Sequence, residues 1–217
     1  MGNWDKDESN YSKIKMPGIL RQEQPLKEKV SRTIYKLKVQ QNKLDSSISR
    51  MQNHDRELFN KCVSAQTVKD SARATMYANE CAEIRKMASV TLRSQLALEQ
   101  VALRLETIRE FGDIAALMGP VSEVVRSVKT QISGIMPEMS FELDEIGDTL
   151  NSMMVEVGEA TGQTYNAETS SSEAQKILSE AGTVAEQRIK EKFPDFSSKE
   201  FESSKISQFG TEERTQT

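Results

Sequence analysis

The stretch VSRTIYKLKVQQNKLDSSISRMQNHDRELFNKC, residues 30–62, decides the fold. Apolar side chains recur along it at alternating spacings of four and three residues, a heptad pattern with two polar interruptions. Its ten positions are Val30, Ile34, Leu37, Gln41, Leu44, Ile48, Met51, Asp55, Leu58 and Cys62. An unbroken heptad seam predicts one long helix that packs along its whole length against another helix.

Helix-breaking residues are scarce on either side of this stretch. Prolines occur only at positions 17, 25, 120, 137 and 194, and between Leu26 and Gly119 the one other breaker is Gly112. Hydrophobic residues make up 36% of the chain and aromatic residues 6%, against 29% charged residues, which is lean for a globular core. We therefore expect an all-α protein built on a long antiparallel helical hairpin at residues 26–118.

The turn of this hairpin is predicted near residues 64–67, because Thr67 and Asp70 have the spacing of a capping box. The second helix, residues 68–117, has two apolar stripes. A single antiparallel partner needs only one stripe, so the other is available to another segment or another subunit, and we interpret this surplus as a sign of self-association. The first stripe is Tyr77, Cys81, Ile84, Ala88, Leu98, Ala102 and Leu105, and the second is Met87, Val90, Ala97, Val101 and Ile108.

Two prolines divide the next part of the chain. Gly119-Pro120 is predicted to end the second helix and to begin a short helix at residues 121–135. Pro137 then precedes an amphipathic helix at residues 138–159. Its apolar positions also alternate by three and four: Leu143, Ile146, Leu150, Met153 and Val157.

The sequence predicts less regular structure toward both ends of the chain. Residues 161–172 have linker composition, and Ser170 with Glu173 has the spacing of a capping box that would start a C-terminal helix at residue 173. We expect residues 1–24 to form a flexible N-terminal arm and residues 197–217 a disordered tail.

Charge is distributed unevenly, although the formal net charge is only −4. Residues 1–118 carry 20 Lys and Arg against 15 Asp and Glu, whereas residues 119–217 carry 9 against 18. The basic residues concentrate at nine positions: Lys13, Lys15, Arg21, Lys27, Lys29, Arg32, Lys36, Lys38 and Lys43. Such a segment suits an anionic partner, which is a membrane surface, a nucleic acid or an acidic tract of the same chain.

The acidic tract is residues 130–175, which contain no Lys or Arg. Its densest part, FELDEIGDTLNSMMVEVGEA at residues 141–160, carries six carboxylates: Glu142, Asp144, Glu145, Asp148, Glu156 and Glu159. An acidic amphipathic helix on the same chain as a basic hairpin is an intramolecular competitor for whatever the basic surface would otherwise bind.

Patterns of catalytic or metal-binding residues are absent from the sequence. The one histidine, His54, lies in the middle of the heptad helix, and Cys62 and Cys81 do not have the spacing of metal ligands. The glycines form no phosphate-binding or dinucleotide-binding motif. No apolar run is long enough to span a membrane, and residues 1–24 lack the features of a signal peptide. We expect a cytosolic protein that is not an enzyme and needs no cofactor, metal or catalytic site.

Three segments carry a resemblance to a known family: KLKVQQNKLDSSISRMQNHDRELFNKC (36–62), DSARATMYANECAEIRKM (70–87) and LALEQVALRLETI (96–108). Together with the short helix and the acidic helix that follow, they resemble the ESCRT-III family, and in particular its archaeal cell-division members. The resemblance covers about residues 25–160 and rests on helix length, charge and apolar spacing.

The resemblance implies a hairpin with shorter C-terminal helices folded back on it, in a protein that switches between a closed monomer and an open, polymerising form. Such filaments assemble on anionic membrane lipids at the division site, on the inner face of the membrane, and constrict it. Their expected partners are further copies or paralogous ESCRT-III subunits, a AAA+ ATPase that disassembles the polymer, and a membrane-recruiting division protein. For that last partner we find no binding motif.

We predict that the acidic helix holds the closed state. Its acids Glu142, Asp144, Glu145 and Asp148 would face the basic hairpin, while Leu143, Ile146, Leu150 and Met153 would bury against the second stripe of the hairpin. The nine basic residues of segment 13–43 would then bind the membrane in the open state, where each is worth about 1 kcal/mol near an anionic surface. A solvated acidic face without a switching role is the simpler alternative.

A candidate ATPase-binding motif follows the C-terminal helix. Phe193, Pro194, Asp195 and Phe196 resemble an extended motif that binds the MIT domain of the ATPase, because Pro194 would keep Phe193 out of helical geometry and present both rings along a strand. Ser197 departs from the motif, which has a second proline there. The preceding helix, with Arg188, Ile189 and Lys192, is the alternative helical motif.

Two functions of other classes remain open on the residues alone: a crescent-shaped, membrane-bending coiled-coil dimer of the BAR type, and a cytosolic coiled-coil scaffold. A nucleic acid is not expected as a partner, because the whole chain is acidic and no aromatic residues for base stacking interrupt the basic segment.

Overall fold

The computed structural model describes residues 26–111, 114–162 and 167–193. Within these ranges all regular structure is helical, which confirms the expected all-α class. Five helices follow one another along the chain: α1 Leu26–Thr67, α2 Ser71–Phe111, α3 Ile114–Ile132, α4 Pro137–Thr161 and α5 Ala167–Lys192. The predicted N-terminal arm and C-terminal tail lie outside the described residues.

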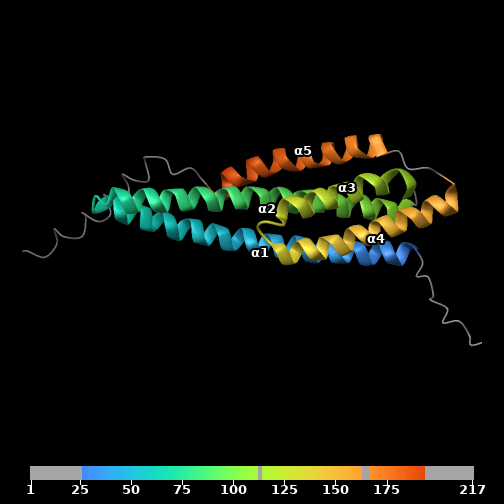
Figure 1. The fold of residues 1–217 in the computed structure, drawn as a ribbon, viewed down its shortest axis with the longest axis horizontal. Helices are drawn as coiled ribbons and strands as arrows, with labels where there is room; N and C mark the ends of the chain where they lie inside the picture. The colour runs from blue at the N-terminus through green and yellow to red at the C-terminus, as the bar shows by residue number, and fades with distance from the viewer. Residues whose placement is uncertain (1–25, 112–113, 163–166, 194–217) are drawn as a thin grey trace, which may run out of the picture.

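Helices α1 and α2 form the long antiparallel hairpin that the heptad pattern predicts (Figure 1). Most apolar seam positions of α1 are buried, including Val30, Leu37 and Leu44, whereas Met51 and Cys62 are half-buried. Both polar interruptions of the seam bind α2. The Gln41 amide nitrogen donates to the carbonyl oxygen of Leu98 at 3.0 Å, and Asp55 accepts two hydrogen bonds from the Arg85 guanidinium, at 2.8 and 3.0 Å.

The turn of the hairpin lies three residues later than predicted, because α1 continues through Thr67. The Thr67 hydroxyl donates back to the carbonyl of Val63 at 3.0 Å, which keeps it inside the helix. Asp70 caps α2 instead, since its carboxylate accepts the backbone N–H of Arg73 at 3.1 Å. Between them, Lys69 has the left-handed conformation, with φ 61°.

The predicted boundary at Gly119-Pro120 is also wrong, because both residues lie buried inside α3. Helix α2 ends at Phe111 and α3 begins at Ile114, so the break between these helices precedes Ile114 and does not lie at the proline. Proline removes one backbone hydrogen bond from a helix interior. Burial of α3 among the other helices compensates for that loss, which the local pattern did not reveal.

Helix α4 ends at Gly162, which has φ 66° and donates its N–H to the carbonyl of Gly158 at 2.9 Å. A glycine in this left-handed conformation is a common helix stop. The predicted linker 161–172 is therefore too long, since α5 begins at Ala167. Ser170 is buried within α5 and does not start it, so the capping box predicted there is wrong.

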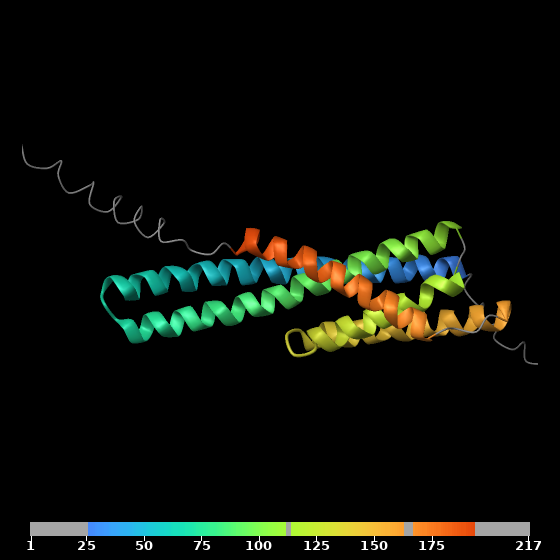
Figure 2. The ribbon, with the colours of Figure 1, turned by 90° about the horizontal axis from the view of Figure 1, so that it is seen from above.

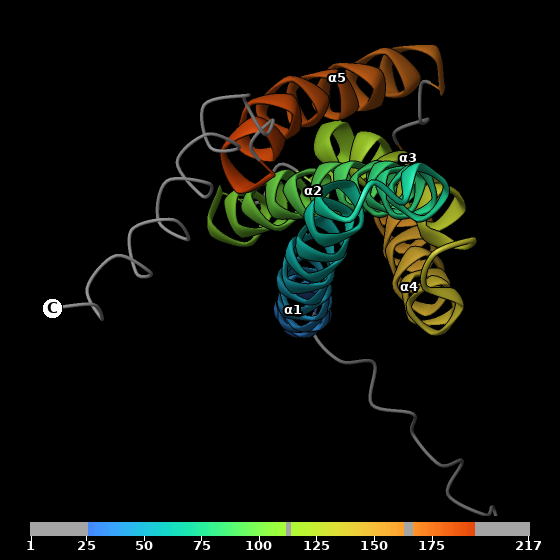
Figure 3. The same ribbon diagram turned by 90° about the vertical axis from the view of Figure 1, so that its left-hand side faces the viewer.

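The C-terminal helices fold back on one half of the hairpin (Figure 2). Helix α3 contacts α2, α4 contacts α3 and α1, and α5 contacts α2 and α3. Viewed along the long axis in Figure 3, α5 lies on one side of α2, whereas α1 and α4 lie on the other. One continuous apolar core contains residues of all five helices, and a smaller cluster of Leu58, Cys81 and Ile84 fills the distal half of the hairpin.

Candidate functional site: an acidic helix on a basic hairpin

Three lysines of α1 bind three glutamates of α4. The Nζ atoms of Lys29 and Lys36 lie 2.6 Å from carboxylate oxygens of Glu156 and Glu145, and Lys43 binds both oxygens of Glu142, at 2.6 and 2.8 Å. These lysines are seven residues apart, so they form one stripe along α1. Their partners run in the opposite order along α4, which therefore lies antiparallel to α1 at this contact. We call these contacts the lysine–glutamate ladder.

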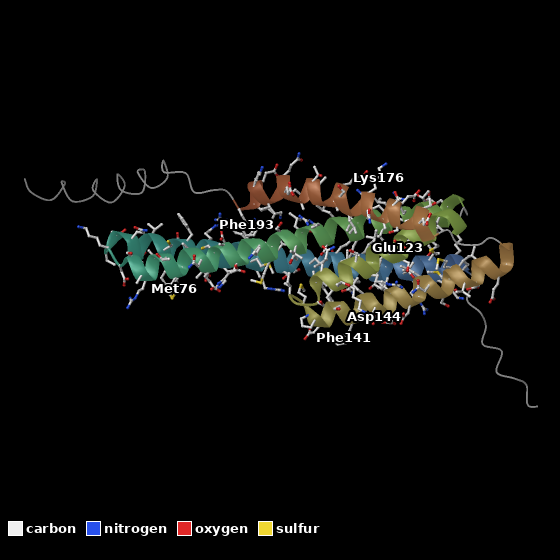
Figure 4. All side chains as sticks on the ribbon, turned by 45° about the horizontal axis from the view of Figure 1, so that its top comes forward. Met76, Glu123, Phe141, Asp144, Lys176 and Phe193 are labelled. Carbon is white, nitrogen blue, oxygen red and sulfur yellow. The ribbon has the colours of Figure 1, made fainter. Side chains whose placement is uncertain are left out.

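Other charged residues of α4 lie close to the ladder. Asp144 binds Lys129 of α3. Asp148 lines an open groove of about 540 Å³ between α1 and α4, together with Glu145, Lys29, Arg32 and Lys36. All four acids that were predicted to hold the closed state thus lie at or near basic side chains of α1 or α3. Figure 4 shows Asp144 on the outer side of α4, near Phe141, which is itself exposed.

The apolar face of α4 supplies most of the energy that holds the helix in place. Leu143, Ile146, Leu150 and Met153 are at most 1% exposed. Burial of one such side chain contributes about 1.5–3 kcal/mol, whereas an exposed ion pair contributes about 0.2–1 kcal/mol. The ladder glutamates are 37–69% exposed. The ladder therefore sets the position and direction of α4 more than its affinity.

The surface that receives this apolar face differs from the prediction. Helix α4 packs on α3 and α1, whereas the helices that pack on α2 besides α1 are α3 and α5. Ala97, Val101 and Ile108 of that stripe are buried in the shared core. This part of the stripe is thus not available for self-association in this conformation, whereas Met87 of the same stripe is 36% exposed. Sequence reasoning missed α3 as the partner because α3 was expected to be shorter and to begin after Pro120.

A polar contact fixes the register of α3 and α4. The hydroxyl of Ser122, on α3, donates to Oδ1 of Asn151, on α4, at 2.6 Å. Ser122 is buried, and a hydrogen bond that is lost inside a core costs about 1–3 kcal/mol. This pair therefore disfavours shifts of α4 along α3.

Glu142 is the one acid of α4 with a resolved pKa shift. The hydrogen bond from Lys43 lowers the pKa of this carboxyl below its ordinary value of 4.5, against a smaller opposing effect of burial. A hydrogen bond from Gln40 acts in the same direction as that from Lys43. Glu142 is therefore ionised at neutral pH, and its charge is coupled to the docking of α4.

The nine predicted membrane-binding residues fall into three groups. Lys13, Lys15 and Arg21 lie outside the described residues. Lys29, Lys36 and Lys43 form the ladder, and Lys38 binds Glu106 of α2 at 2.7 Å. Lys27 and Arg32 are exposed. The heptad spacing of the three ladder lysines is visible in the sequence, and it distinguishes them from the other six predicted membrane-binding residues.

The predicted ATPase-binding motif is only partly described, since Pro194, Asp195 and Phe196 lie outside the described residues. Phe193 is 4% exposed, and its N–H donates to the carbonyl of Ile189 at 2.8 Å. It is therefore not presented on an extended strand in this conformation, in contrast to the prediction (Figure 4). The physical reason is that Phe193 continues the buried stripe of Ala174, Ile177, Ala181 and Ala185 on α5.

The distal hairpin contains the cysteines and a buried ion pair. Asp55 binds Arg85 there, and its side chain is 5% exposed. Burial, followed by the charge of Asp55, raises the pKa of the Cys81 thiol to about 11. Among the described residues no group of side chains has the composition of a metal site. His54 is exposed and lies 3.9 Å from Glu57.

Fold and site define a class of protein: an elongated helical chain whose acidic helix is bound to a basic hairpin. Cell division protein B1 of Sulfolobus acidocaldarius is 47% identical to this chain over 182 residues, 84% of each protein. Cell division protein B of the same organism is 36% identical over 74% of this chain and 61% of its own length. The chain therefore belongs to the archaeal cell division protein B (CdvB) family of ESCRT-III proteins.

Cell division protein B3 of Sulfolobus acidocaldarius is 25% identical over 77% of this chain and 96% of its own length. No protein-family model matches the chain, and no solved structure matches it. In the part of the chain that the structure describes, no helix is long and apolar enough to cross a bilayer.

Proposed function

We propose that this protein acts in archaeal cell division as a subunit that polymerises on the division-site membrane, and that the described conformation is its closed form. The relatives named cell division protein B and B1 support the process. The observation that supports the closed form is the lysine–glutamate ladder, since it neutralises three of the residues that sequence analysis assigned to the membrane.

Release of α4 makes the molecule competent for membrane binding. Lys29, Lys36 and Lys43 then join the exposed Lys27 and Arg32 on α1. At about 1 kcal/mol for each basic residue near an anionic surface, five such residues hold one subunit weakly and a polymer tightly, because linked sites bind with avidity. The attraction is electrostatic, so it falls as salt rises.

Release of α4 also uncovers the apolar surface of α3 and of α4 itself. Leu143, Ile146, Leu150 and Met153 lose their partners at that point, and an exposed apolar stripe of this size favours association with another protein surface. We propose that the corresponding stripes of other copies, or of paralogous subunits, supply the new contact. The same event thus produces both membrane affinity and polymerisation.

The protein contributes no catalysis in this proposal. A AAA+ ATPase supplies the energy for disassembly and binds, through its MIT domain, the segment Phe193–Phe196 or the end of α5. A membrane-recruiting division protein is a further partner. The ATPase and the recruiting protein are both proposed as partners from the family resemblance.

Charge reversal tests the closed form in the full chain. The triple variant Glu142→Lys, Glu145→Lys, Glu156→Lys breaks the ladder. The matched control Glu80→Lys, Glu99→Lys, Glu191→Lys makes the same change of net charge at exposed acids that form no ion pair among the described residues. Co-sedimentation with vesicles rich in anionic lipid, together with negative-stain imaging, should show filaments and membrane binding for the ladder variant at concentrations where the control stays dispersed.

Two outcomes would count against the proposal. Equal sedimentation of the ladder variant and the control would mean that net charge, not the ladder, governs association. A discrete dimer in every variant would favour a membrane-bending coiled-coil dimer or a scaffold over a polymer.

A further inference from the structure

The distal half of the hairpin carries an apolar cleft. Phe59 and Cys62 of α1 and Ala78, Cys81, Ala82 and Arg85 of α2 line it, around a volume of about 260 Å³. For comparison, an apolar cavity of about 150 Å³ is sufficient to bind benzene. The cleft is therefore large enough for one aromatic side chain.

Helix α5 points toward this cleft. It runs along the hairpin in the direction of the hairpin tip (Figure 2). Its end is fixed on α1, because the Gln52 amide nitrogen donates to the carbonyl oxygen of Lys192 at 3.0 Å. The next residue, Phe193, is buried. The chain therefore leaves α5 on the hairpin surface rather than in solvent.

The cleft lies on the same face of the hairpin as α5. On α1, Phe59 follows Gln52 by seven residues, which is two helical turns, so both side chains point the same way. On α2, Arg93 lies 4.0 Å from Glu186 of α5, and Ala82 precedes Arg93 by eleven residues, three turns away on the same face. Both helices thus lead from the end of α5 to the cleft.

The spacing matches the sequence that follows α5. Seven helical residues from Gln52 to Phe59 cover about 10 Å, and three extended residues from Phe193 to Phe196 also cover about 10 Å. Pro194 lacks the N–H that would continue the helix, which favours an extended chain at this point. An extended chain after Phe193 is therefore long enough to bring Phe196 to the position of Phe59.

We propose that the segment Pro194–Phe196 of the same chain docks on the distal hairpin, with the ring of Phe196 in the cleft formed by Phe59, Cys62, Ala78, Cys81, Ala82 and Arg85. Phe193 and Phe196 then both bind the hairpin of their own chain. A partner that needs both rings must compete with this contact. This last consequence rests on the proposed ATPase binding, whereas the docking itself does not.

The native thiol of Cys62 reports on the cleft without any introduced residue. It lines the cleft and is partly exposed, whereas burial raises the pKa of the other lining thiol, Cys81, to about 11 and keeps it unreactive near neutral pH. Maleimide labelling of Cys62 in the full chain should be several-fold faster in Phe196→Ala than in the unmodified protein. Phe201→Ala is the matched control and should leave the rate unchanged.

A second measurement tests proximity directly. In Phe196→Cys, mild oxidation with copper-phenanthroline should form an intramolecular disulfide with Cys62, at least tenfold faster than in the control Ser207→Cys. Peptide mapping identifies the linked pair. Equal rates for the two variants, together with unchanged labelling in Phe196→Ala, would overturn the proposal. A disulfide-linked dimer, or protection of Cys62 that depends on protein concentration, would also overturn it by assigning the cleft to a second copy.

Discussion

At the scale of single residues, the turn between α1 and α2 is held by an uncommon choice of amino acid. The N–H of Asp70 donates to the carbonyl of Ala65 at 2.9 Å, and that of Lys69 to Gln66 at 3.0 Å. These two bonds form the Schellman motif, which usually has glycine in the left-handed position. Here the position is occupied by Lys69, with φ 61°. A side chain in this conformation costs about 1 kcal/mol.

Lys69→Gly should therefore raise the free energy of unfolding by about 0.5–1 kcal/mol, part of the gain being offset by the greater freedom of glycine in the unfolded chain. Lys61→Gly, at an exposed position inside α1, should lower it by about 1 kcal/mol. Urea unfolding followed by circular dichroism measures both changes. A loss of stability in Lys69→Gly as large as in Lys61→Gly would contradict the left-handed assignment.

A second residue-scale prediction concerns the pH dependence of the closed form. Because Lys43 lowers the pKa of Glu142 in the docked state, this contact stabilises docking at pH values above the ordinary pKa of 4.5 and is lost as pH falls through the lowered pKa. Hydrogen exchange of the α4 amides should therefore accelerate as pH is reduced below about 4.5, after correction for the intrinsic pH dependence of exchange. Glu142→Gln should exchange faster at neutral pH and show a smaller pH effect.

At the scale of helices, the sequence predicts local features such as helix formation and the buried face of a helix. It fails where contacts with other helices determine the structure. The heptad seam gives α1, and the spacing of Leu143, Ile146 and Leu150 gives the buried face of α4. Gly119-Pro120 misleads because its breaker character is outweighed by burial within α3. The partner of α4 cannot be read from the sequence, since an apolar stripe shows that a face is buried but not which helix covers it.

Glycines inside α4 and α5 allow each helix to be stabilised separately. A side chain at Gly147 of α4 meets no atom within 4 Å, and one at Gly182 of α5 comes no closer than 3.5 Å to Arg93. Alanine favours a helix interior over glycine by about 1 kcal/mol. Gly147→Ala should therefore slow exchange of α4 amides about fivefold and reduce filament formation.

Gly182→Ala should have the same effect on α5 amides. If α4 alone restrains the polymer, Gly182→Ala should leave the concentration at which filaments form unchanged. A reduction of filaments by Gly182→Ala equal to that by Gly147→Ala would show that both helices must leave the hairpin before assembly.

At the scale of the whole molecule, the ladder links the closed state of the chain to the membrane affinity of α1. Exchanging the charges of the ladder separates these two properties. The sixfold swap replaces Lys29, Lys36 and Lys43 by Glu, and Glu142, Glu145 and Glu156 by Lys, so the opposite charges still meet and the net charge is unchanged. The swapped chain should stay closed and dispersed, as the unmodified protein does. Its open form, however, presents an acidic stripe on α1.

Adding Leu150→Asp opens either chain, because it places a charge in the buried contact between α4 and α3. In the unmodified background this variant should form filaments that bind anionic vesicles and dissociate at high salt. In the swapped background it should still form filaments, but vesicle binding should fall at least tenfold. Equal vesicle binding in both backgrounds would show that lysines at positions 29, 36 and 43 of α1 are not required for the membrane contact.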